Sequence, residues 1–254
     1  MLRVSLVLIS TMVALLTASA QQRTPSVAVP KPYRPVAVTL PAPSDDASFE
    51  TFRKELAAVA KGRVYAELER IVTAQGFFWD RDFGSGFDAR KPAVDNLATA
   101  LRLEHRDGAG WRALAIFAAE PAAAPLPARL GIVCGPGRPD YDSPDFERLM
   151  DTTRTDGTDW TYPRADQTPV RAAPRIDAAV VDTLGMHFVR MLGHAGKDNE
   201  PDPLRTVWIR VAPPSGKTGF VAPDSLTSLY VERLCYGKDE RGRWRIAGFV
   251  GGGD

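Results

Sequence analysis

Beyond residue 44, the first half of the chain repeats apolar positions at the spacing of α-helices. In the segment after residue 47, apolar residues recur three and four positions apart, which places them on one helix face. They are Phe49, Phe52, Leu56 and Val59. Similar segments follow at 64–72, 94–101 and 111–118. Ser143-Pro144 predicts a fifth helix, because serine caps helices and proline suits the first helical position. We predict a helix-rich domain of unidentified fold over 45–165, with one strand near 130–134.

After Pro169 the pattern changes to short segments rich in β-branched and aromatic residues, separated by turns. Residues 207–211 alternate in the two-residue period of a strand with one buried face. Residues 234–236 and 244–249 flank a polar loop and predict a hairpin. Many short strands in about 85 residues favour a small barrel or sandwich. The predicted fold class is α+β, with helices first and a strand-rich second part over 168–254.

The first twenty residues predict a cleavable signal peptide. Arg3 precedes an apolar run from Val4 to Leu16, and residues 18–20 (Ala-Ser-Ala) fit the small-x-small cleavage pattern. The alternatives are an uncleaved anchor or a buried helix, but the run is shorter than the roughly 20 residues that span a bilayer. No cysteine stands directly after the cut, where Gln21 lies, and no later stretch is long and apolar enough to span a bilayer. We therefore expect a periplasmic or secreted protein that is not inserted in the membrane after cleavage.

Residues 21–44 contain six prolines. Proline fixes φ and removes a backbone donor, so this segment is expected to be an extended linker. An extended arm laid on the folded part is the alternative.

Charge gives no indication of a nucleic-acid partner. Removing residues 1–20 also removes Arg3, which leaves 31 basic and 31 acidic residues in 234. A net charge near zero offers no electrostatic attraction to nucleic acid or to anionic lipid.

The two cysteines, Cys134 and Cys235, both occur in short apolar segments typical of strands. In an oxidising compartment such a pair can form a disulfide. The bridge would close a loop of about 100 residues, worth about 4–5 kcal/mol in the chain-entropy model. Two separate buried thiols are the alternative.

Four pieces of the second part resemble, in order, the bacterial SH3 (SH3b) domain. They are residues 170–174 (opening strand and proline turn), 180–184 (next strand), 208–211 (tryptophan-bearing strand) and 215–221 (Ser-Gly-Lys-Thr-Gly-Phe-Val hairpin). The resemblance covers about 170–230. The segment between Leu192 and Thr206 is longer than usual, and the hairpin of Cys235 and Trp244 is an extra element. The whole chain is also similar to uncharacterised exported SH3-domain proteins of proteobacteria.

This resemblance implies a small SH3-like barrel over 168–254 that binds a cell-wall peptide, peptidoglycan or an envelope protein. The family's binding surface is an aromatic-lined groove. The residues proposed to line it are Trp208, Phe220, Tyr236 and Trp244. The alternative is that these aromatic side chains fill the interior of the barrel.

Motifs for catalysis, cofactors and metals are weak throughout the chain. The Gly216-Lys217-Thr218 sequence lacks the upstream glycine of a phosphate-binding loop, since Val211 stands there. No histidine among His105, His187 and His194 has a second ligand at metal spacing. The acidic residues Asp80, Asp82 and Asp88 lack the spacing of a calcium loop. We predict no cofactor and no metal.

The sequence favours an exported, non-enzymatic protein that binds a cell-envelope ligand. One alternative is a cell-envelope hydrolase with its active site in 45–165, using either Cys134 as nucleophile or a pair of carboxylates. The other is that the strand-rich part only braces the first domain.

Overall fold

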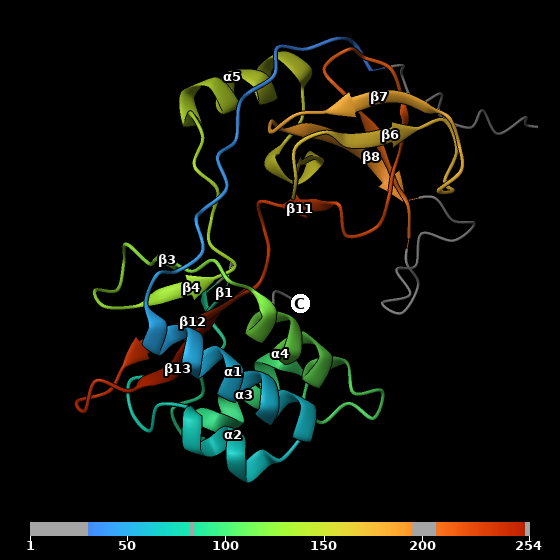
Figure 1. Cartoon of the computed structure of the whole chain (residues 1–254). Helices are drawn as coiled ribbons and strands as arrows, with labels where there is room; N and C mark the ends of the chain where they lie inside the picture. Colours follow the sequence, from blue (N-terminus) through green and yellow to red (C-terminus); the bar gives the residue numbers. More distant parts are fainter. Residues whose placement is uncertain (1–29, 82–83, 195–206, 252–254) are drawn as a thin grey trace, which may run out of the picture.

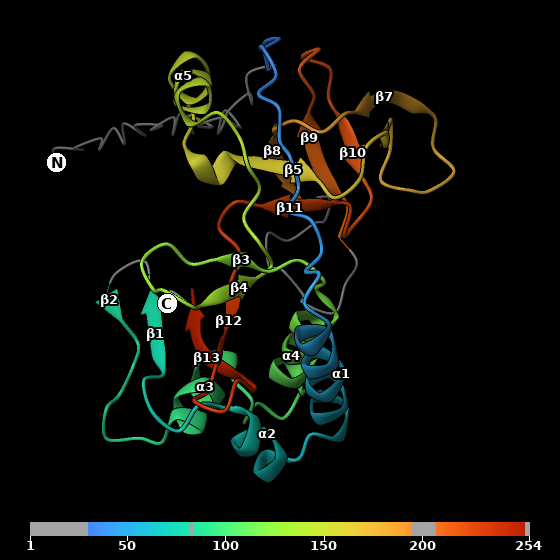
Figure 2. The same ribbon diagram turned by 60° about the vertical axis from the view of Figure 1, so that its left-hand side comes forward.

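The computed structural model describes residues 30–81, 84–194 and 207–251, so the predicted signal peptide lies outside the described residues. The described residues form two units, each built on its own β-sheet (Figures 1 and 2). The first unit combines four helices with a six-stranded sheet. The second combines one helix with a seven-stranded sheet.

The first unit places all four of its helices along one face of its sheet (Figure 1). The helices are α1 (Ala47–Gly62), α2 (Tyr65–Ile71), α3 (Ala93–Leu101) and α4 (Ala109–Ala119). The strands are β1 (Phe78–Arg81), β2 (Gly84–Ser85), β3 (Ala124–Pro125), β4 (Val133–Gly135), β12 (Arg233–Lys238) and β13 (Trp244–Val250), in the order β2-β1-β13-β12-β4-β3. The first and last parts of the chain therefore meet in one sheet.

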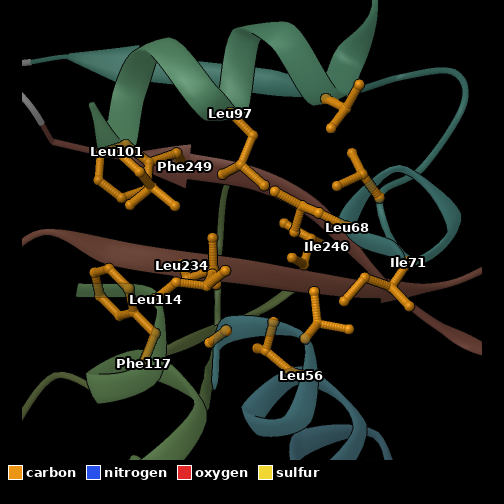
Figure 3. Close-up of a cluster of buried hydrophobic side chains, with 14 of the residues drawn as sticks. Leu56, Leu68, Ile71, Leu97, Leu101, Leu114, Phe117, Leu234, Ile246 and Phe249 are labelled. Carbon is orange, nitrogen blue, oxygen red and sulfur yellow. The ribbon is translucent and has the colours of Figure 1, made fainter. Parts of the chain in front are cut away.

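Helix α1 forms as its sequence predicts. The Asp46 side chain caps it by accepting hydrogen bonds from the backbone N–H groups of Ser48 and Phe49. Its predicted apolar stripe is buried against α4 and the central strands β12 and β13. Figure 3 shows Leu56 of this stripe beside Leu68 and Ile71 of α2 and the strand residue Ile246. The apolar faces of these helices thus pack against the same sheet.

The hairpin of β12 and β13 forms the centre of the first sheet. Strand β13 runs parallel to β1, and β12 pairs antiparallel with β4, with Leu234 opposite Gly135. The side chains of Leu234, Ile246 and Phe249 are fully buried beneath the helices (Figure 3). The sequence analysis placed this hairpin beside the SH3-like segment, whereas the structure pairs it with β1 and β4.

The second unit lies between β4 and β12 in the chain. Its elements are α5 (Ser143–Thr153), the 3-10 turn η1 (Gly157–Asp159), β5 (Trp160–Pro163), β6 (Thr168–Arg171), β7 (Val180–Leu184), β8 (Val189–His194), β9 (Ile209–Ala212), β10 (Gly219–Val221) and β11 (Leu226–Ser228). The sheet order is β11-β5-β8-β9-β10-β6-β7. Because β4 and β12 are neighbours, this unit is an insertion between two adjacent strands of the first sheet.

The prediction of a small SH3-like barrel is wrong. The seven-stranded sheet has two edges, β11 and β7, and is not closed. Leu226 of β11 and Leu184 of β7 do share one buried cluster with residues of the central strands. The sheet also takes in β5, from the segment predicted to be helical. The alternating pattern of a strand indicates that one of its faces is buried. It does not indicate whether the two edge strands pair and close the sheet into a barrel.

The described part of the proline-rich segment, residues 30–44, is an arm that packs on the second unit before it enters α1 (Figure 1). Val36 and Val38 are buried there. The Tyr33 hydroxyl donates to the carbonyl oxygen of Ala212 at 3.0 Å, and its backbone N–H donates to that of Pro214 at 3.1 Å. This part is therefore not a free linker.

Among the described residues, no helix combines the length and the apolarity needed to cross a bilayer.

Candidate functional site

The four aromatic residues proposed as a ligand groove fall on different units. Trp208 directly precedes β9, and Phe220 lies on β10 opposite Arg210, both in the second unit. Tyr236 lies on β12 and Trp244 on β13, both in the first unit. The structure therefore does not bring the four together in one groove.

Tyr236 is a core residue. It is 1% exposed and meets the rings of Phe49 and Phe52 edge-on, at centroid distances of 5.1 and 5.9 Å. Burial raises the pKa of its phenol well above the usual range. A side chain enclosed in this way cannot also contact a ligand at the surface.

Replacing Tyr236 by alanine is expected to destabilise the protein by about 3–5 kcal/mol, the usual cost of removing a buried aromatic ring. Tyr236→Phe keeps the ring and is expected to stay close to wild type. Urea unfolding followed by circular dichroism measures both. Full stability in Tyr236→Ala would contradict the core assignment.

Trp244 lines a hollow of about 590 Å³ between the start of α1, helix α2 and the β12–β13 turn. Its lining residues are Ser48, Thr51, Phe52, Glu55, Arg70, Gly242, Arg243, Trp244 and Arg245. A volume of this size falls in the range of small-molecule sites. We refer to it as the Trp244 hollow.

Polar contacts hold the Trp244 ring in place. Its indole N–H donates to the Ser48 hydroxyl oxygen at 3.0 Å, and the Lys238 ammonium lies 4.8 Å from the ring centroid. The same Lys238 donates to the Asp46 carboxylate at 2.9 Å. Hydrogen bonds from the Ser48 hydroxyl and from Lys238 hold the pKa of Asp46 well below its usual range. One network of polar contacts thus joins the residues that cap α1 to those that line the hollow.

Three arginines line the hollow, and two of them share one carboxylate. Asp239 accepts from the guanidinium groups of Arg243 at 3.0 Å and Arg245 at 3.2 Å. Hydrogen bonds from the Arg243 backbone and side chain lower the pKa of Asp239, so it stays ionised. The third, Arg70, lies 3.9 Å from Glu67. Exposed pairs of this kind contribute little, so cationic groups remain available to a ligand.

Cys134 and Cys235 form a disulfide across the neighbouring strands β4 and β12. Both side chains are fully buried. A sulfur in a disulfide is not a thiolate nucleophile. The alternative of a hydrolase that uses Cys134 as its nucleophile therefore lacks the reactive group.

The other chemistry-bearing residues of the sequence are dispersed. Asp80 pairs with Arg129 at 3.0 Å and Asp88 pairs with Arg90 at 2.9 Å, while Asp82 lies outside the described residues. Within the described part of the chain, no three His, Cys, Asp or Glu side chains are grouped to hold a metal. A second hollow, of about 210 Å³, lies between the arm and α5 and is lined by Arg34, Asp145 and Arg148 among others.

The sequence analysis named Trp244 but missed the arginines around it. A signal was available, because Arg241, Arg243 and Arg245 alternate around the turn that carries Trp244. Arg70 could not be associated with them, since it lies on a distant helix that only the fold brings to the same hollow.

Comparisons with known proteins add no relative: no family model, no curated protein and no solved structure matches this chain. The resemblance of 170–230 to bacterial SH3 domains therefore stays a prediction.

Proposed function

We propose that this is an exported, non-enzymatic protein that binds peptidoglycan of the cell envelope in the Trp244 hollow. The observation that carries the proposal is the hollow itself, about 590 Å³ with an aromatic wall and three arginines. A hollow of this volume suits a small unit such as a sugar or a short peptide, whereas protein partners use broader and flatter surfaces. The predicted signal peptide supports exposure to the envelope.

The composition of the hollow favours binding over catalysis. Arginine stays protonated in proteins and does not act as a general base. Hydrolysis of a glycosidic bond commonly uses two carboxylates that flank the bond. Glu55 is the one carboxylate among the described residues that line the Trp244 hollow. These residues are therefore equipped to hold a ligand and not to cleave it.

Co-sedimentation of the full mature chain with purified peptidoglycan sacculi tests the proposal. We expect binding, and we expect Trp244→Leu to weaken it about tenfold, since an aromatic contact worth about 1.4 kcal/mol corresponds to that factor. Trp244→Phe keeps a ring in the hollow and is expected to restore most of the binding.

Trp208→Leu is the matched control, because Trp208 belongs to the other unit, outside the Trp244 hollow. We expect it to bind as the wild type does. Equal binding by the Trp244→Leu and wild-type proteins would exclude this hollow as the site. Retention by envelope proteins with none by sacculi would replace peptidoglycan with a protein partner.

A further inference from the structure

The Trp244 hollow gathers charges of both signs. Three of its lining side chains are arginines and one is a glutamate. Two further carboxylates pair with these arginines: Asp239 with Arg243 and Arg245, and Glu67 with Arg70 at 3.9 Å. The charges around the hollow therefore balance, and a ligand that enters it meets separate positive and negative groups.

The three arginines differ in how firmly they are held. The Arg245 side chain is 17% exposed, pairs with Asp239 and donates to the Trp244 carbonyl oxygen at 3.2 Å, so it belongs to the wall. The Arg243 side chain is 55% exposed and that of Arg70 is 73% exposed. Arg243 already donates to Asp239 from Nε at 3.1 Å and from Nη2 at 3.0 Å, so a further acceptor would use its remaining N–H groups and those of Arg70. A guanidinium fork binds a carboxylate through two parallel hydrogen bonds.

Glu55 gives the α1 wall of the hollow a negative charge. Its side chain is exposed, and no described cationic group lies within ion-pair distance of it. Glu55 lies on α1, Arg70 on α2 and Arg243 at the β12–β13 turn, so three elements bring the two signs of charge to one hollow. The Trp244 ring adds an apolar surface. This combination matches a ligand with a carboxylate, an amine and aliphatic carbons between them.

We propose that the Trp244 hollow recognises the free end of a peptide. Arg70 and Arg243 bind its terminal carboxylate, Glu55 binds a side-chain amine, and Trp244 packs on the carbons between them. The inference rests on the proposed function and deepens it, because it assigns recognition to the peptide part of peptidoglycan and not to the glycan. Binding is non-covalent, with no bond made or broken.

Isothermal titration calorimetry on the full mature chain tests this with three probes. Nα-acetyl-L-Lys-D-Ala-D-Ala carries one carboxylate and one side-chain amine, its C-terminal amide lacks the carboxylate, and its Nε-acetylated form lacks the amine. We expect the free acid to bind and the amide to bind at least about tenfold more weakly, as for the loss of a charge-assisted hydrogen bond. The Nε-acetylated form is expected to lose affinity by a smaller factor. Oligomers of N-acetylglucosamine are expected not to bind.

Variants link each ligand group to its residue. Arg70→Gln and Arg243→Gln are expected to weaken binding of the free acid while leaving the affinity for the amide almost unchanged. Glu55→Gln is expected to remove the preference for the free amine. Arg175→Gln is the matched control, because Arg175 is 68% exposed and loosely paired, at 3.5 Å from Asp177, but lies in the second unit.

The outcomes separate the two proposals. Retention on sacculi, together with equal affinity for the acid and the amide or with binding of the glycan oligomer, overturns the peptide inference and leaves the proposed function standing. Absence of retention on sacculi overturns the proposed function. Equal loss of acid binding in the Arg175→Gln and Arg243→Gln proteins would show a general charge effect and also overturn the inference.

Discussion

A chain that ends at Glu232 is expected to lose the fold of its first unit, although all four helices of that unit remain in the sequence. The deletion removes β12 and β13, the two central strands of the six-stranded sheet. Leu234, Ile246 and Phe249 then no longer cover the apolar faces of the helices. Most helical stability in proteins comes from packing of the apolar face, so the helices are expected to melt. Far-UV circular dichroism would show a large loss of helix signal.

The complementary variant is expected to stay folded. Gly135 and Leu234 are paired on neighbouring antiparallel strands, so a short loop can join β4 directly to β12 in place of residues 138–231. Such a connection removes the second unit but keeps the complete six-stranded sheet. The arm before residue 41 is removed as well, since it packs on the second unit. A wild-type helix signal in the chain ending at Glu232, or a disordered loop-joined chain, would contradict the insertion architecture.

The helical part of this fold could be predicted because its signal is local. The stripe of Phe49, Phe52, Leu56 and Val59 indicates both a helix and the face that is buried. The partner of that face could not be predicted. Strand β12 lies more than 170 residues further along the chain than α1, and its apolar pattern looks the same whichever sheet it joins. The predicted hairpin with β13 forms, but assigning it to the adjacent strands followed sequence order, whereas the structure pairs the hairpin with β4 and β1.

The arm shows a similar limit. Six prolines in 21–44 indicate an extended backbone but not whether it is free. The alternation of Val36 and Val38 with Ala37 was a sign of a half-buried extended segment, and both valines are buried in the structure. For the site, the sequence analysis grouped four aromatic residues in one groove, and of these only Trp244 lines the hollow. The charges that define the Trp244 hollow come from α1, α2 and the β12–β13 turn, and only tertiary structure joins these.

The disulfide between Cys134 and Cys235 is expected to contribute strongly to the stability of the first unit. In the double variant Cys134→Ala/Cys235→Ala, the free energy of unfolding should fall by about 4 kcal/mol, because the bridge closes a loop between residues 101 apart. Both positions are buried among apolar side chains, so alanine introduces no unpaired polar group. The expected loss is largest when the whole loop unfolds. Guanidinium titration under non-reducing conditions measures it.

The location of the bond makes this effect specific to one unit. Cys134 and Cys235 lie where the chain leaves the first sheet and returns to it, so the bridge fixes both ends of the insertion. Without it, only strand pairing between β4 and β12 joins these two ends. We therefore expect faster amide exchange in β4 and β12 of the variant, with β8 and β9 unchanged. A loss below about 1 kcal/mol, or two titratable thiols in the unreduced denatured wild type, would contradict this account, since the entropic stabilisation requires a formed bond.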